Sequence, residues 1–232
     1  LILEVKGTRI AFLAYCSVLP KGYDARPEKS GCAPMRAATF YEQVDWQAGT
    51  PPRVITIADK NDLAALSDDI RKVKPLADVV IMSIHWGVHI VPATIAMYQK
   101  EVAYAAIDAG VDLILGHHAH IPKGIEVYKG KVIFYSLGNF VLPSRFTGYR
   151  TGLKAFYRVP LDPAYVDYDY PVDSRKSTIA KCIIADRQIE RVSYLPLMIN
   201  RYAQPEVLGC LDERSSEVYN YMEWCCKDQG LD

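Results

Sequence analysis

The strongest constraint on the fold is a pair of buried-strand patterns separated by one helical segment. Residues 79–84 form a near-continuous apolar run, and residues 112–115 form a second one. Such runs are typical of strands that are covered on both faces of a sheet. The segment between them, residues 93–109, is predicted to be a helix that ends at Gly110. A strand, a crossover helix and another strand predict an α/β fold with parallel strands.

Hydrophobic periodicity and turn residues predict further elements on both sides of this unit. The predicted strands lie at residues 2–5, 8–15, 54–57, 125–128, 131–136, 178–185 and 188–195. A helix is predicted over residues 59–73, capped by Asp59 or Asn61, and a terminal helix over residues 213–227. Residues 16–53 and 160–177 are rich in turn-forming residues and are predicted to be irregular. The first of them is long enough to act as a lid.

Composition excludes several classes of protein. Lys plus Arg and Asp plus Glu both number 27, so the chain lacks the basic excess typical of nucleic-acid binding. No run of about 18 apolar residues is present, so no membrane span is predicted. The six Cys form no C-x₂-C pair, which argues against a Cys-based zinc site. Cys16 and Cys32 flank one loop and can form a disulfide or remain free thiols.

The beginning of the chain has the pattern of the interior of a fold. A strand pair starts at residue 1, and no signal-peptide pattern precedes it. We expect either an N-terminally truncated or processed chain, or a trimmed but complete domain. The absence of a targeting pattern therefore does not define a location.

All five His of the chain follow two neighbouring predicted strands. His85 and His89 come after the run 79–84, and His117, His118 and His120 come after the run 112–115. In an open α/β sheet, ligands bind beyond the carboxyl ends of the strands. Imidazole is a common ligand of Zn, Mn, Fe and related ions. The cluster therefore predicts a metal site.

Individual His are not equivalent in this prediction. His85, His118 and His120 are the predicted ligands. His89 either lines the pocket or is an ordinary loop residue, and in an extended segment His117 would point away from its neighbours. Both remain candidates for proton transfer.

One further polar residue follows the strand at 131–136. Asn139 can present its amide to an anion, orient a His, or simply end the strand in a turn. Asp78 and Asp112 precede their strands, so we expect them at the opposite edge of the sheet and exclude them as ligands. Trp86 is expected to pack beside the site.

Several of these segments together resemble one known family. The sequences IHWG at residues 84–87, GHHAH at 116–120 and IFYSLGNF at 133–140 are similar to the capsule synthesis protein CapA family. The run into the second motif, residues 105–115, matches as well. This family is the poly-γ-glutamate capsule group of the calcineurin-like metallophosphatase superfamily. The resemblance is good over residues 1–142 and looser to about residue 208.

The resemblance implies a fold, a cofactor and a location. We expect the C-terminal portion of a metallophosphatase-like, four-layer α/β/β/α sandwich over residues 1–208, followed by a helical extension at 209–232. His85, His118 and His120 match metal ligands of a dinuclear centre holding Mn, Fe or Zn, whereas Asn139 and Tyr135 match a wall of its pocket. The family is linked to the cell envelope.

The sequence also departs from the family's pattern. The early Asp pair and the Asn-His segment of the superfamily belong before residue 1, and no Asn-His dipeptide occurs in this chain. His89 stands where the family more often has an acidic residue. The chain thus carries the C-terminal half of the expected site.

Three functions are compatible with this pattern. The first is a metal-dependent hydrolase or transferase of capsule biosynthesis that acts on a phosphoester or amide, with His89, His117 and Asn139 as catalytic candidates. The second is a non-catalytic subunit that binds an anionic polymer or capsule-assembly proteins. The third is a metal-dependent enzyme that modifies peptides. No nucleic-acid partner is expected.

Overall fold

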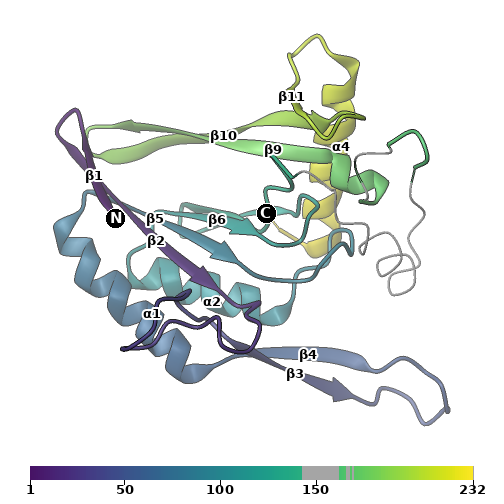
Figure 1. Ribbon diagram of the computed structural model, residues 1–232, viewed down its shortest axis with the longest axis horizontal. Helices are drawn as coiled ribbons and strands as arrows, with labels where there is room; N and C mark the ends of the chain where they lie inside the picture. Colours follow the sequence, from purple (N-terminus) through teal and green to yellow (C-terminus); the bar gives the residue numbers. More distant parts are fainter. Residues whose placement is uncertain (143–161, 166–167, 169, 232) are drawn as a thin grey trace.

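The core of the molecule is a mixed sheet of six strands in the order β1-β2-β5-β6-β8-β7 (Figure 1). The computed structural model describes residues 1–142, 162–165, 168 and 170–231. The four central strands are parallel, and both outer strands run antiparallel to their neighbours. The strands of this sheet are β1 (Ile2–Val5), β2 (Thr8–Cys16), β5 (Val79–His85), β6 (Leu113–His117), β7 (Ile125–Tyr128) and β8 (Lys131–Phe134). The predicted α/β class is confirmed, and so is the parallel pairing of the strands predicted at 79–84 and 112–115.

Two helices cover one face of this sheet (Figure 1). Helix α1 (Lys60–Val73) begins as predicted, because the Asp59 carboxylate accepts hydrogen bonds from the first backbone N–H groups. Helix α2 (Met97–Ala109) starts four residues later than the predicted residue 93. Ala93 has a φ of 54°, which no helical residue adopts, so the preceding segment is a loop.

Strand β5 shows why its sequence is apolar without interruption. Val80, Met82 and Ile84 pack on the helical side, in the larger hydrophobic cluster. Val79 and Ile81 face the other way, into a cluster shared with strands β9 and β10. Because successive side chains alternate between faces, both faces must be covered for the whole run to be buried.

The second face of the large sheet packs against a three-stranded sheet in the order β11-β10-β9. Its strands are β9 (Lys176–Ala185), β10 (Gln188–Ile199) and β11 (Pro205–Val207). The predicted late hairpin is confirmed, with Asp186 and Arg187 in the left-handed turn. Of the predicted loop at 160–177, residues 160–161, 166–167 and 169 lie outside the described residues. Residues Val172–Arg175 form a 3₁₀ turn, and β9 already starts at Lys176.

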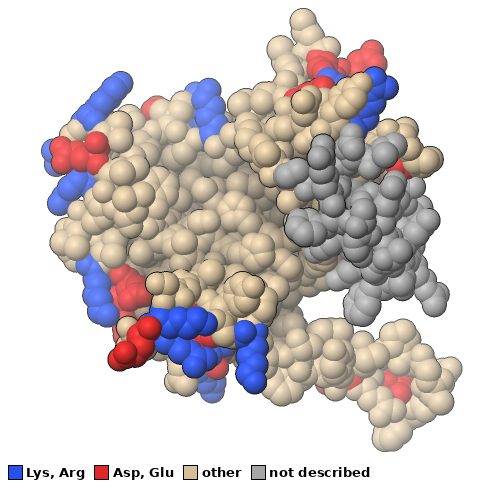
Figure 2. Space-filling view, in the orientation of Figure 1, with Lys and Arg blue, Asp and Glu red and all other residues tan. Residues whose placement is uncertain are grey.

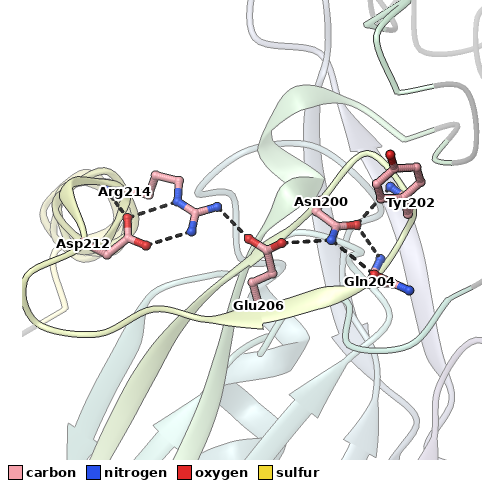
Figure 3. A network of polar contacts seen from close by, with 6 residues as sticks. All are labelled: Asn200, Tyr202, Gln204, Glu206, Asp212 and Arg214. Atoms are coloured by element: carbon pink, nitrogen blue, oxygen red, sulfur yellow. Dashed lines mark hydrogen bonds and ion pairs between the residues drawn. The ribbon is translucent and has the colours of Figure 1, made fainter.

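Helix α4 (Glu213–Gln229) packs against β10 and β7. The predicted apolar stripe of Val218, Tyr221, Met222 and Cys225 is buried there. A polar network fastens its first turn to the end of the three-stranded sheet (Figure 3). Glu206 accepts hydrogen bonds from Asn200 at 2.9 Å and from Arg214 at 2.7 Å, and Arg214 also pairs with the capping Asp212.

The prediction that residues 16–53 are irregular is wrong for the second half of this segment. Strands β3 (Ala37–Glu42) and β4 (Arg53–Ala58) pair as a hairpin that projects from the body of the molecule (Figure 1). All of β3 is exposed, so its side chains leave no buried face for the alternation rule to detect. Residues 17–36 remain irregular and lie beside the end of β2.

The layers agree with the predicted metallophosphatase-like α/β class. Helices α1 and α2, the six-stranded sheet and the three-stranded sheet form an α, a β and a β layer. In the part of the chain that the structure describes, α4 is the α-helix that lies beside the three-stranded sheet. No helix among the described residues combines the length and apolarity needed to cross a membrane.

Candidate functional site

The five His gather at the carboxyl edge of the parallel strands. Strand β5 ends at His85 and strand β6 ends at His117, and these two residues are register partners. The loops that leave the two strands carry the other three His. The fold therefore brings together residues more than 30 positions apart, as the sequence predicts for parallel neighbours.

Four of the imidazole rings form one cluster. His118 Nδ1 lies 3.0 Å from His85 Nε2. The His89 ring stands between two others, with its centroid 5.3 Å from that of His118 and 4.9 Å from that of His120. His89 is thus a member of the cluster, a placement for which the sequence left two alternatives.

The backbone that carries His118 and His120 is unusual. Their φ angles are 97° and 58°, in the left-handed region that side chains other than glycine rarely adopt. Each such residue costs about 1–3 kcal/mol and persists only where the surrounding structure holds it. The segment is therefore not extended beyond His117.

Close packing beneath the motif explains the glycine at its start. A Cβ on Gly116 would lie 2.2 Å from the Tyr135 carbonyl oxygen and 2.6 Å from Trp86 Nε1. Trp86 is fully buried and donates a hydrogen bond to that same carbonyl. Trp86 therefore supports the site from below, as predicted. Tyr135 packs in this core as well and bonds to Glu126, so it is a supporting residue.

Asn139 orients one of the His. The His120 Nδ1–H donates to Asn139 Oδ1 at 2.7 Å. This bond places the proton on Nδ1 and leaves the Nε2 lone pair available for a ligand. The Asn139 amide nitrogen in turn donates to the Tyr168 hydroxyl at 2.6 Å. Of the three alternatives for Asn139, this geometry favours the orienting role.

Two tyrosines beside the site were missed by the sequence reasoning. The Tyr170 ring stacks on His120 with a centroid separation of 4.8 Å, and Tyr168 is buried against it. Both lie in the segment predicted to be a loop. The only signal in the sequence was the high number of Tyr in residues 160–177, which does not show that any of them lies beside the His cluster.

Lys123 is a second residue that the sequence reasoning missed. Its side chain is almost fully buried, and its ammonium group donates to the carbonyl oxygens of Val91 and Thr94. Burial lowers the pKa of Lys123 to about 8. Lys123 follows the GHHAH segment closely, so these bonds fasten the loop after His89 to the loop that carries His120.

Burial makes the imidazoles neutral at neutral pH. It lowers the pKa of His118 to about 3 and that of His89 to about 4, and neighbouring His add to both shifts. The pKa values of His85, His117 and His120 are lowered as well, again mainly by burial. Neutral imidazole is the form that binds metal ions.

His117 lies between two cavities. One, of about 630 Å³, is lined by the end of β2, by His85 and by part of the loop 17–33. The other, of about 350 Å³, lies against Leu137, Phe140 and the start of β9. His117 is therefore placed to contact a molecule in either cavity.

Cys16 and Cys32 both line the larger of these two cavities and are free thiols in the structure.

The donor set fits a divalent metal ion in its chemistry. With metal–nitrogen bonds of about 2.0–2.1 Å, two His nitrogens on one tetrahedral ion lie about 3.3 Å apart. The 3.0 Å between His85 and His118 is close to that separation. Within the described ranges, however, no group of three His, Cys, Asp or Glu side chains is already arranged to hold an ion. The structure thus presents a pair of neighbouring imidazoles, His85 and His118, with His120 and His89 beside it.

The acidic residues excluded by the sequence lie at the opposite edge. Asp112 accepts from Lys74, Lys131 and the Val80 backbone, and Asp78 pairs with Arg9. A further cavity, of about 670 Å³, lies near Arg175 and Arg214, but both arginines already pair with carboxylates. Neither place competes with the His cluster as the candidate site.

Comparison with known proteins places the chain in a family. Residues 1–144 match the model of the bacterial capsule synthesis protein PGA_cap. The PGA biosynthesis protein CapA of Bacillus subtilis (strain 168) is 30% identical over 76% of this chain and 40% of its own length. The capsule biosynthesis protein CapA of Bacillus anthracis is 32% identical over 62% of this chain and 29% of its own length. The chain thus spans less than half of these relatives.

Solved structures give a weaker likeness. A hypothetical protein from Thermus thermophilus is 14% identical and aligns with 84% of this chain and 60% of its own, at a TM-score of 0.45.

The family model covers the six-stranded sheet, helices α1 and α2, all five His and Asn139. The chain belongs to the bacterial capsule synthesis protein family PGA_cap.

Proposed function

We propose that this chain carries the His half of a metal-dependent hydrolase or transferase site that acts in poly-γ-glutamate capsule biosynthesis. The curated relatives are named for PGA and capsule biosynthesis, and the family model covers the His cluster. The substrate class is a phosphoester or amide of an anionic polymer or peptide. The observation that carries the proposal is the pair His85 and His118, with their nitrogens 3.0 Å apart.

The ligands of the proposed ion are His85, His118 and His120. A divalent ion such as Mn, Fe or Zn would supply Lewis acidity at the carboxyl edge of the sheet. Because no three His, Cys, Asp or Glu side chains among the described residues are already arranged around one point, His120 would have to approach the pair formed by His85 and His118. A dinuclear centre would need further ligands still. Asn139 holds His120 in the tautomer that has Nε2 available.

The remaining His are suited to proton transfer. His117 borders two cavities, so its ring can reach the leaving group of a molecule bound in either of them. His89 lies between His118 and His120, and its ring is unprotonated at neutral pH, so it can accept a hydrogen bond from the attacking water. We assign His117 to the leaving group and His89 to the attacking water.

Two adjacent His provide a matched test. We would measure bound transition metal by mass spectrometry in the unmodified chain, in His118→Ala and in His117→Ala. The proposal expects about one ion per chain, lost in His118→Ala and retained in His117→Ala. Hydrolysis of phosphoesters and glutamyl amides should fall in both variants.

A non-catalytic binding subunit is the second candidate. It is favoured by the absence of a ready three-ligand group in the described ranges. Under this alternative all three proteins would be free of metal, and binding of poly-γ-glutamate would persist in His118→Ala. That combination contradicts the enzyme proposal.

A further inference from the structure

The cavity beside His85 and His117 differs in character from a site for a polyanion. It has a volume of about 630 Å³, which lies in the range of small-molecule sites. Its walls come from the end of β2, from β5 and β6, and from the loop 17–33. None of the described residues that line it is Lys, Arg, Asp or Glu.

The side chains that line the cavity are mainly apolar. Val18, Leu19, Pro20 and Tyr23 form the loop side, and Ala14 lies on the sheet side. Three charged groups of the loop have partners within it, since Arg26 pairs with Asp24 and Lys29 donates to the Gly22 carbonyl. A carboxylate placed in this cavity would lose water without gaining a cationic partner among the described residues that line it, which is costly.

The neighbouring cavity repeats this character. It lies on the other side of His117 and is lined by Leu115, Leu137, Phe140 and residues of β9, and its described lining again holds no charged side chain. The surface over the second half of β2 and over β5 also shows no Lys, Arg, Asp or Glu, while charged side chains lie around it (Figure 2). His117 thus stands between two uncharged hollows.

We propose that the cavity between the loop 17–33 and His85 binds an uncharged alkyl or aryl group of the substrate, next to the bond that is broken. The inference rests on the proposed function, because it is the His cluster that places the cavity beside the reacting centre. It adds a substrate feature that the polymer itself does not supply. The scissile group would carry the anionic part on one side and an apolar substituent on the other.

A series of phosphate esters tests the inference through binding alone. We would measure affinities for methyl phosphate, hexyl phosphate and hexyl phosphate with a terminal carboxylate by titration calorimetry. Each buried methylene should tighten binding about fourfold, so we expect hexyl phosphate to bind at least about tenfold tighter than methyl phosphate. The terminal carboxylate should abolish this gain. Equal affinity for the methyl and hexyl esters would overturn the inference.

A pair of valine variants localises the effect. Val18 lines the cavity and is 40% exposed, whereas Val44 lies beyond β3 and is 58% exposed. Because both side chains are exposed, each Val→Asp change should leave the fold intact, which a thermal melt verifies. Val18→Asp should remove the gain from the hexyl chain, and Val44→Asp should keep it. A gain that survives in Val18→Asp would also overturn the inference.

Hexanol separates this inference from the proposed function. Its binding needs neither a metal nor a phosphate subsite. If hexanol binds and Val18→Asp prevents it, the cavity is confirmed even where metal analysis finds no ion and the proposed function fails. If metal is present and hexanol does not bind, the proposed function stands and the inference falls.

Discussion

The two edges of the six-stranded sheet both carry ionisable residues, but they satisfy them in opposite ways. At the amino edge, Asp112 has only 11% of its side chain exposed and is neutralised by Lys74 and Lys131. At the carboxyl edge, imidazoles contact one another, and two of them sit on strained backbone. The paired charges of the amino edge indicate a structural role. The crowded imidazoles and strained backbone of the carboxyl edge are typical of a functional site.

The largest effect that separates the two edges is expected at Asn139. Asn139→Ala removes the acceptor that orients His120, and loss of such a partner weakens metal binding by about 10–100-fold. A competition titration with a chelator measures this change. The control is Asn200→Ala, which breaks the network of Figure 3 away from the His cluster and should leave metal affinity unchanged. Equal affinities in both variants would count against the orienting role.

At the amino edge we expect an effect on stability instead. Asp112→Ala removes the shared partner of two lysines and of the Val80 backbone, and should lower the free energy of unfolding by about 2 kcal/mol. Urea denaturation measures this loss, and metal content should not change. Asp108 pairs with Lys129 in an exposed position, so Asp108→Ala should have little effect. A loss of metal in Asp112→Ala would break the division between the two edges.

The smallest expected effect is the pH dependence of the same contacts. Burial of Asp112 works against its ionisation, but hydrogen bonds from Lys131, Lys74 and Val80 outweigh it and lower its pKa below 3.8. The unfolded chain therefore binds the proton more readily, and the free energy of unfolding falls as pH drops below about 4. The difference in unfolding free energy between the unmodified chain and Asp112→Asn should shrink in this range. A difference that stays constant from about pH 7 to about pH 3 would exclude this linkage.

The contrast between the edges also explains which residues could be predicted. His85, His118 and His120 follow two apolar runs whose parallel direction is implied by the helix between them, so their meeting point was predictable. Asp112 could be excluded by the same rule, because it precedes its strand. Lys123 could not be assigned, since its burial depends on carbonyl groups that belong to a loop about 30 residues earlier in the chain.

The hairpin β3–β4 could not be predicted from the sequence, for a different reason. Its residues pair with each other, but β3 has no buried face that would impose alternation on its sequence. Local pattern detects a strand through its packing, so an exposed ribbon carries little signal. The neighbouring segment 17–36 was predicted as irregular and is irregular, because its Gly and Pro restrict the backbone directly.

The sequence by itself determined the α/β class, the parallel direction of the two strands that precede the His, and the edge at which the His meet. These features depend on the periodicity of apolar residues and on the positions of turns, which are local properties. Only the tertiary structure decided that His89 joins the cluster, that Asn139 orients His120, and that an uncharged cavity opens beside His117. Such relations depend on side-chain directions and left-handed backbone angles, which are fixed by packing between distant segments and leave no periodic trace.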